Sequence, residues 1–242
     1  MHPDRTKNLA IIPARGGSKR IPGKNIKLFF GKPIIAYSIE TALTSGLFDE
    51  VIVSTDDEKI AAIAQEFGAK VPFIRSAKNA SDSAGLNDVF IEVLNYYQIQ
   101  EKHFTNFCGI LSTAPLLESK HLSESFSLLN ENAHAVIPVV KYDFPVERYL
   151  TIEDEILKVG DKENYSKRSQ DLPNKFHDAG QFYWANCSSY LLNKGFYKLM
   201  PKAYLLNRNI FQDIDTLEDW ERVEMIYRFL DMKKKPKRSF LY

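Results

Sequence analysis

The chain has 242 residues, a length typical of one large domain that can include a small inserted segment. Its residues are 44% hydrophobic and 26% charged, which excludes a disordered chain and a disulfide-held miniature scaffold. With 32 Lys and Arg against 31 Asp and Glu, the formal net charge is +1, so no global field draws the chain toward nucleic acid or a membrane surface. Any anion-binding site must be local.

The two cysteines, Cys108 and Cys187, do not form a CxxC pattern, and we expect both to be reduced thiols. The opening MHPDRTKN lacks the apolar stretch of a signal peptide. No segment approaches the roughly 18 consecutive apolar residues of a membrane span. These observations predict a cytoplasmic protein that does not contact membranes.

Short β-rich runs alternate with amphipathic stretches as far as residue 140, which predicts a mainly parallel central sheet with crossover helices. The expected strands are Leu9–Ala14, Val51–Ser54, Val71–Ile74, Phe107–Leu111 and Ala135–Val140. The expected helices lie near Pro33–Ser45, Glu58–Phe67, Asn87–Tyr97 and Ser119–Asn130.

This periodicity fades between residues 141 and 176, where charges are scattered among short β-like pieces at Tyr149–Ile152 and Ile156–Val159. We interpret this stretch as an arm inserted into a single domain that spans residues 1–242. Strand-like alternation resumes at Gly180–Ala185. A last helix is expected from Leu217 to Leu230, because its apolar residues recur at helical spacing.

The segment IIPARGGSKRIPGKN, residues 11–25, follows the first strand and is rich in glycine and cations. Gly16 and Gly17 allow backbone amides to approach an anion, and Ser18 adds a hydroxyl donor. From Arg5 to Ile39 inclusive, the chain has eight Lys or Arg residues and no Asp or Glu. In a chain of nearly zero net charge, this asymmetry indicates an anion pocket.

A surface turn with solvated lysines is the alternative, but the position of the loop favours a binding site. The carboxyl end of the first strand of an open α/β sheet is where phosphate-bearing ligands usually bind. Two common phosphate loops are excluded, because GxGxxG is absent and the spacing from Gly17 to Gly23 does not fit GxxxxGK[ST].

The PARGGSK…PxKN pattern resembles the first motif of the CMP-sialic acid synthetase family, cytidylyltransferases that activate nine-carbon 2-keto sugar acids. The resemblance implies a Rossmann-like nucleotide-diphospho-sugar transferase fold and places the triphosphate of CTP on this loop. The residues it implicates are Arg15, Gly16, Gly17, Ser18, Lys19, Lys24 and Asn25. Of these, Arg15 and Lys24 are expected to be catalytic, because they would neutralise the departing diphosphate.

The segment QDIDTLEDW, residues 212–220, carries Asp213 and Asp215 two positions apart, so an extended backbone presents both carboxylates on one side. Such oxygen ligands suit Mg²⁺ that bridges phosphates. Capping of the last helix by Asp215 with Glu218 is the alternative. In the family that the first loop resembles, this pair holds the metal, and we therefore expect both aspartates to be catalytic metal ligands.

The segment RSQDLPNKFHDAGQFYW, residues 168–184, resembles the family's RxQD motif and the strand after it. The run HDAGQFYW is similar to the branch that uses pseudaminic acid, whereas the sialic acid branch has Asn-Gly where this chain has Ala179-Gly180. The resemblance implies six residues that contact the sugar acid: Arg168, Gln170, Asp171, His177, Asp178 and Gln181. An ordinary surface histidine is the alternative reading of His177.

Two positions depart from the family pattern. Its PTSP or PTAP turn is Ser112-Thr113-Ala114-Pro115 here, and a small hydroxyl residue expected further upstream falls at Gly85-Leu86. By the same resemblance, Arg75 and Thr113 are expected to contact the nucleotide.

The resemblance implies transfer of CMP from CTP to pseudaminate with Mg²⁺, for surface-glycan or flagellin glycosylation. The same reaction on N-acetylneuraminate or legionaminate stays open, as does a nucleotide-sugar binding protein without turnover. A homodimer that shares its sites through the arm follows from the resemblance alone.

Overall fold

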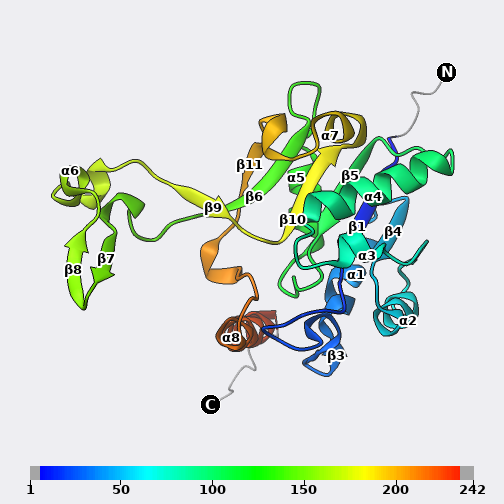
Figure 1. The fold of residues 1–242 in the computed structure, drawn as a ribbon, viewed down its shortest axis with the longest axis horizontal. Helices are drawn as coiled ribbons and strands as arrows, with labels where there is room; N and C mark the ends of the chain where they lie inside the picture. The colour runs from blue at the N-terminus through cyan, green and yellow to red at the C-terminus, as the bar shows by residue number, and fades with distance from the viewer. Residues whose placement is uncertain (1–5, 235–242) are drawn as a thin grey trace, which may run out of the picture.

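A seven-stranded mixed sheet forms the centre of the computed structural model, which describes residues 6–234 (Figure 1). Six of its strands follow the order β11-β6-β10-β5-β1-β4, and β9 pairs with β6. β1 is parallel to both β4 and β5, whereas β10 runs antiparallel between β5 and β6. The strands are β1 (Asn8–Pro13), β4 (Glu50–Ser54), β5 (Asn106–Ile110), β6 (Ala135–Lys141), β9 (Phe176–Asp178), β10 (Phe182–Asn186) and β11 (Lys202–Leu205).

Helices cover both faces of this sheet, as the alternation along β1 requires. Ala10 and Ile12 belong to an apolar cluster with α1, α2 and α5, whereas Leu9 and Ile11 belong to one with α4 and α7. All four side chains are fully buried. The helices are α1 (Ile34–Thr44), α2 (Glu58–Glu66), α3 (Ala77–Ala80), α4 (Leu86–Ile99), α5 (Ser119–Phe126), α7 (Cys187–Asn193) and α8 (Leu217–Lys234).

Most predicted elements are present within a few residues of their expected ends, and three expectations are wrong. The central sheet is mixed and not mainly parallel, because β9 and β10 run antiparallel to the strands that they pair with. Residues Val71–Ile74 form no strand, and the chain makes only isolated bridges there, through Lys70 and Ile74. Pro72 lacks the N–H that a continuous ladder needs. The helix predicted to reach Asn130 ends at Phe126, where the hydroxyls of Ser125 and Ser127 donate to backbone carbonyls of the preceding turn.

A third apolar cluster attaches α8 to the beginning of the chain. Phe29 lies in the small hairpin of β2 (Leu28–Phe29) and β3 (Lys32–Pro33), and its ring centroid is 5.7 Å from that of Trp220 and 5.2 Å from that of Tyr227. Figure 1 shows α8 beside β3. This contact brings the segment that precedes α8 next to the first loop.

The segment 141–176 leaves the body of the molecule beside β6 and returns as β9 (Figure 1). It carries the hairpin of β7 (Leu150–Glu153) and β8 (Ile156–Val159), followed by α6 (Lys162–Tyr165). Asp154 and Glu155 turn the hairpin with φ values of 49° and 64°. Within residues 6–234, no helix combines the length and the apolar character that crossing a bilayer requires.

Gly109 allows α4 to pack closely on the centre of the sheet. A Cβ atom at this position in β5 would lie 2.3 Å from Cζ of the buried Phe90. We expect Gly109→Ala to lower the free energy of unfolding by about 1–3 kcal/mol, as overpacking of a core does. Urea unfolding measures this, with Gly195→Ala as the control, because there the nearest atom is 3.7 Å away. Equal stability of the two variants would contradict the prediction.

Candidate functional site

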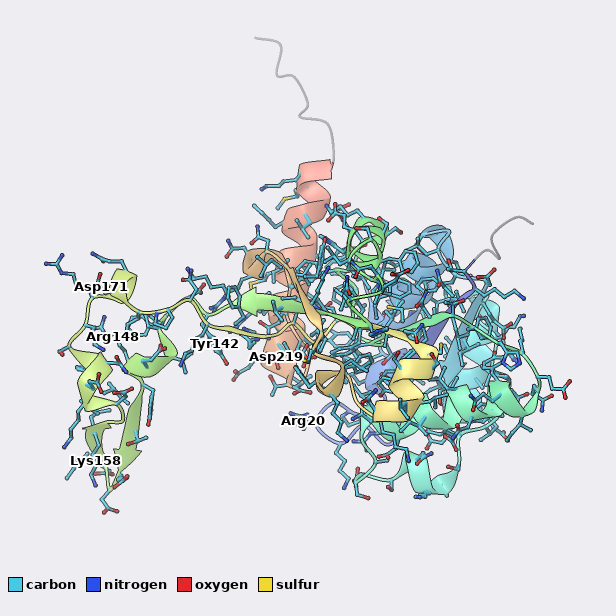
Figure 2. The ribbon with its side chains drawn as sticks, turned by 90° about the horizontal axis from the view of Figure 1, so that it is seen from above. Arg20, Tyr142, Arg148, Lys158, Asp171 and Asp219 are labelled. Atoms are coloured by element: carbon cyan, nitrogen blue, oxygen red, sulfur yellow. The ribbon has the colours of Figure 1, made fainter. Side chains whose placement is uncertain are left out.

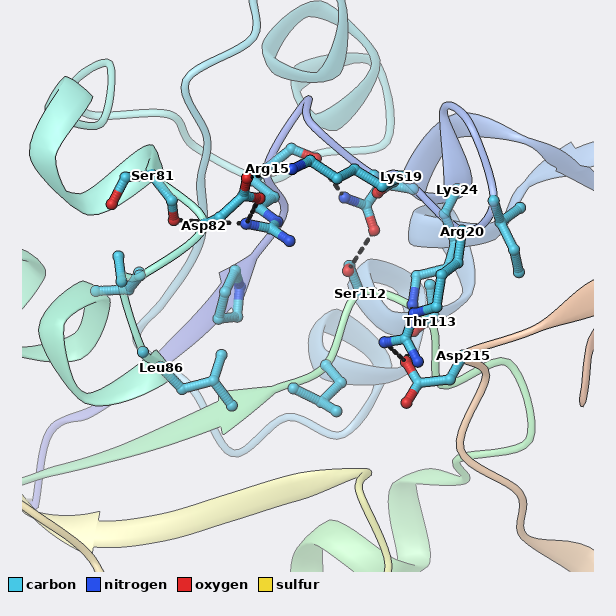
Figure 3. A pocket seen from close by; sticks show the side chains of 18 of the residues that line it. Arg15, Lys19, Arg20, Lys24, Ser81, Asp82, Leu86, Ser112, Thr113 and Asp215 are labelled. Atoms are coloured by element: carbon cyan, nitrogen blue, oxygen red, sulfur yellow. Dashed lines mark hydrogen bonds and ion pairs between the residues drawn. The ribbon is translucent and has the colours of Figure 1, made fainter.

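A cavity of about 520 Å³ lies at the carboxyl end of β1, between the first loop and the segment that precedes α8 (Figure 3). Its walls combine cationic, hydroxyl and carboxylate side chains with apolar ones. The predicted residues that line it are Arg15, Ser18, Lys19, Lys24, Asn25, Arg75, Thr113, Asp213 and Asp215. The structure therefore gathers nine of the expected site residues from four separate segments of the chain.

The two glycines of the first loop have different surroundings, and neither lines the cavity. The Gly16 amide donates to Asp56 Oδ1 at 3.0 Å, and a Cβ atom at Gly16 would lie 2.8 Å from Asp57 Oδ2. Gly16 thus allows the loop to pack on the residues that precede α2. Gly17 has no neighbour within 4 Å of its hypothetical Cβ.

Asp82 neutralises the first two cations of the loop. Nη1 of Arg15 donates to Asp82 Oδ1 at 3.0 Å, and Nζ of Lys19 lies 2.5 Å from Asp82 Oδ2. Hydrogen bonding to Lys19 is the main reason why the pKa of Asp82 is below its ordinary value. The sequence analysis did not identify Asp82, which lies 67 residues from Arg15 along the chain.

The other two cations of the loop contact the segment before α8. Nη2 of Arg20 lies 2.8 Å from Asp215 Oδ1, and Nζ of Lys24 lies 3.8 Å from the same oxygen. Lys24 also donates to the Ile214 carbonyl at 2.6 Å. Burial lowers the pKa of Lys24, and the negative charges of Asp215 and Asp213 oppose this shift. Lys24 is the least exposed of the four cations.

The carboxylates of Asp213 and Asp215 are not used to cap α8. Thr216 and Asp219 form the cap instead: Asp219 Oδ2 accepts from the Thr216 amide at 2.8 Å, and Thr216 Oγ1 accepts from the Asp219 amide at 3.2 Å. The capping alternative for Asp215 with Glu218 is therefore wrong. Partial loss of hydration and the neighbouring Asp215 raise the pKa of Asp213.

These two carboxylates suit one type of metal site. No group of three or more His, Cys, Asp or Glu side chains is arranged to hold a metal within residues 6–234. Mg²⁺ usually keeps several waters and binds through one or two protein carboxylates together with substrate phosphates. Two mutually repelling carboxylates opposite a cationic loop therefore fit Mg²⁺ that arrives with a polyphosphate.

Asn25 and Ser112 connect the first loop to the end of β5. Asn25 Nδ2 donates to the Arg15 carbonyl, and Ser112 Oγ donates to Asn25 Oδ1, both at 2.8 Å. The serine that replaces the family's first proline therefore has a structural role. Arg75 is also buried, and its guanidinium donates to the hydroxyl and the carbonyl oxygen of Ser54.

A second cavity of about 410 Å³ adjoins the first, because Gly85 and Leu86 line both. Of the predicted sugar-binding residues, only Asp178 lines it. The Asp178 carboxylate accepts from the hydroxyls of Tyr183 at 3.1 Å and Tyr197 at 3.3 Å. The sequence analysis missed the other polar and aromatic side chains of this wall, which are Asn87, Tyr183, Lys194, Phe196, Tyr197 and Lys198.

Gln181 and His177 line neither cavity. The buried Gln181 Nε2 donates to the carbonyls of Ala179 and Gly180 at 3.2 and 3.1 Å, which fixes the turn before β10. His177 is exposed, and its ring centroid lies 4.8 Å from that of Tyr142 at the base of the arm.

Arg168, Gln170 and Asp171 lie on the exposed arm, outside both cavities. Figure 2 shows Asp171 at the end of the arm that is remote from Arg20. Gln170 lines a separate cavity within the arm. The expectation that these residues share a pocket with Asp178 is therefore not met within one chain.

Comparison with known proteins places these features in context. A family model described as "Cytidylyltransferase" matches residues 9–235. The chain is 40% identical over 225 residues to the pseudaminic acid cytidylyltransferase of Campylobacter jejuni, covering 92% of this chain and 97% of that protein. It is 32% identical to the CMP-N,N'-diacetyllegionaminic acid synthase of Legionella pneumophila, with coverage of 90% and 95%.

The fold is also similar to solved structures of lower sequence identity. A structure of CMP:2-keto-3-deoxy-manno-octonic acid synthetase complexed with CTP superimposes with a TM-score of 0.68 at 18% identity, covering 93% of this chain and 100% of that one. The 4-diphosphocytidyl-2C-methyl-D-erythritol synthase of Anaerococcus prevotii gives a TM-score of 0.64 at 14% identity, covering 93% and 99%. Both support an α/β fold with a mixed central sheet flanked by helices.

Because the pKa of Asp213 is raised, replacing its carboxylate with a neutral side chain should stabilise the folded protein, by an amount that depends on pH. The folded state binds the proton of the Asp213 carboxyl more tightly than the unfolded state does, so the ionised carboxylate destabilises the folded protein at pH 7. This destabilisation disappears as the pH falls toward 3.8, the ordinary pKa of an aspartate side chain. We expect Asp213→Asn to raise the Tm of the ligand-free protein at pH 7 and to lose this advantage near pH 4.

Thermal unfolding at the two pH values measures this effect. Asp215→Asn is the matched control, and it should show no such gain because it removes the ion pair with Arg20. A fall in the Tm of Asp213→Asn at pH 7 would contradict the prediction.

Proposed function

The chain belongs to the cytidylyltransferase family, and on this basis we propose that it transfers CMP from CTP to pseudaminate, forming CMP-pseudaminate and diphosphate. The observation that carries the proposal is the juxtaposition of Lys24, the least exposed cation of the first loop, with the carboxylates of Asp213 and Asp215 in one cavity. This arrangement suits a polyphosphate that accompanies a divalent cation.

In the proposed reaction, the anomeric hydroxyl of the sugar acid attacks the α-phosphorus of CTP, and diphosphate leaves in line. Arg15, Lys19 and Lys24 face the phosphates and neutralise the charge that develops on the leaving group. Asp213 and Asp215 hold Mg²⁺, which when bound supplies further neutralisation of phosphate charge. The main tasks of the protein are positioning and electrostatic stabilisation.

The second cavity is the proposed site of the sugar acid. Gly85 and Leu86 line both cavities, so a ligand there would lie next to the nucleotide site. Phe196 and Tyr197 offer apolar surface for acyl groups, and Lys194 and Lys198 offer positive charge for a carboxylate.

The identity of the sugar acid is tested by diphosphate release from Mg²⁺ and CTP with pseudaminate, N-acetylneuraminate and legionaminate in parallel. The higher identity to the pseudaminic acid enzyme, 40% against 33% for an N-acylneuraminate cytidylyltransferase of Escherichia coli, favours pseudaminate. Diphosphate release with only another sugar acid would support the proposed reaction but contradict pseudaminate as its substrate. Binding of CTP without release would favour a non-catalytic binding protein.

Lys24 gives a direct test of the role of the loop. Loss of one preorganised charge contact costs about 3–4 kcal/mol of barrier, so we expect Lys24→Ala to lower kcat by about 10²–10³-fold. Steady-state diphosphate release measures this, with circular dichroism to verify folding. Lys27→Ala is the matched control, because Lys27 is exposed and does not line the cavity. Near-normal turnover of Lys24→Ala would overturn the assignment.

We also propose that the arm forms a homodimer and completes the partner's site. Its hairpin exposes Leu150, Ile152, Ile156 and Leu157 at 44%, 74%, 62% and 64%, which is apolar surface that a second copy would bury. Arg168 is remote from the cavities of its own chain, and in a dimer it would contribute to the neighbouring sugar site.

Mixing inactive variants tests a shared site. If Lys24 and Arg168 act in one site from two chains, then refolded mixtures of Lys24→Ala and Arg168→Ala regain about a quarter of wild-type activity, because half the dimers are mixed and each has one intact site. Diphosphate release measures the recovery, and light scattering verifies the dimer. A monomer, or a mixture with no recovery, would overturn the proposal.

A further inference from the structure

Asp82 lies in the loop between α3 and α4 and faces the cations of the first loop across the main cavity (Figure 3). Its two carboxylate oxygens contact Arg15 at 3.0 Å and Lys19 at 2.5 Å. Arg15 also donates to the carbonyl of Ser81 at 3.4 Å. Two of the cations that the proposed function assigns to the phosphates of CTP are therefore already paired with an anion of the protein.

The loop that carries Asp82 is fixed at both ends. Ser76 Oγ caps α3 by accepting from the Asn79 amide at 3.4 Å, and the Gly85 amide donates to Asp88 Oδ2 at 2.9 Å at the start of α4. Residues 81–84 between these ends belong to neither helix. Asp82 can therefore leave the first loop without unfolding either helix.

Asp82 and a polyphosphate are competitors for the same donors. Its side chain is 58% exposed, and Lys19 keeps its pKa low, so it is ionised at neutral pH. Arg15 and Lys19 cannot pair fully with both anions at once. Repulsion between the carboxylate and phosphate oxygens adds to this competition.

We propose that Asp82 is an affinity-setting residue that competes with the phosphate chain for Arg15 and Lys19. It occupies these cations in the free protein, withdraws when the triphosphate binds, and returns to them as diphosphate leaves. This inference rests on the proposed binding of CTP at the first loop. Its consequence is that diphosphate, the product that depends most on these cations, is held less tightly and inhibits less.

The test measures binding of inorganic diphosphate and of CMP by calorimetry, without and with Mg²⁺. We expect Asp82→Asn to bind diphosphate about 3- to 10-fold more tightly than the wild type, as removal of a partly exposed competing ion pair allows. CMP, which lacks the outer phosphates, should bind with unchanged affinity. In turnover, the inhibition constant for diphosphate should fall by a similar factor.

Two variants separate this competition from a general effect of charge. Asp82→Glu keeps the carboxylate and should retain wild-type affinity for diphosphate, and Glu66→Gln removes an exposed negative charge outside the cavity and should change nothing. The gain of Asp82→Asn should also shrink at 1 M salt, where the screening length falls to about 3 Å.

Unchanged or weaker diphosphate binding by a folded Asp82→Asn would overturn the inference and leave the proposed function intact. A gain equal to that of Glu66→Gln would also overturn it, because the effect would then be one of net charge. Failure of the wild type to bind both CTP and diphosphate would instead overturn the proposed function.

Discussion

The contact between the first loop and the segment before α8 is the constraint on which the site depends. Lys24 and Ile214 are 190 residues apart in sequence, yet the lysine donates to the backbone carbonyl of Ile214 at 2.6 Å. The contact is maintained by the apolar cluster beneath it, in which Phe29 packs against Trp220 and Tyr227. Since this packing anchors α8, Asp213 and Asp215 face the first loop although the two segments are far apart in the sequence.

Charge pairing explains how a loop so rich in cations is tolerated in the absence of a ligand. Asp82 faces Arg15 and Lys19 on one side of the cavity, and Asp215 faces Arg20 and Lys24 on the other. The pairs near the surface are screened and each contributes little to stability. Lys24 and Asp213 are more strongly desolvated, and their opposite pKa shifts show that burial outweighs their mutual attraction. Without a ligand, the cations and carboxylates of the site are thus paired largely with one another.

The local parts of this structure could be predicted from sequence, and the non-local parts could not. The strand at Val51–Ser54 and the loop after β1 follow from apolar runs and glycine spacing, which act over a few residues. The antiparallel insertion of β10 between β5 and β6 depends on pairing partners far away in the chain. Predicted helix ends failed where serine hydroxyls competed with the backbone, as at Phe126.

The same division applies to the candidate site. The motif around Arg15 identified the cations, but neither Asp82 nor the Asn25–Ser112 hydrogen bond has any signal in a single sequence, because each joins separate segments. The departure at Gly85-Leu86 acquires meaning only in the structure, since these residues form the junction of the two cavities. Gly85 has no side chain and Leu86 has an apolar one, so neither side chain offers a hydrogen-bonding group to either cavity. The departure from the family pattern therefore lies at the boundary between the two proposed substrate sites.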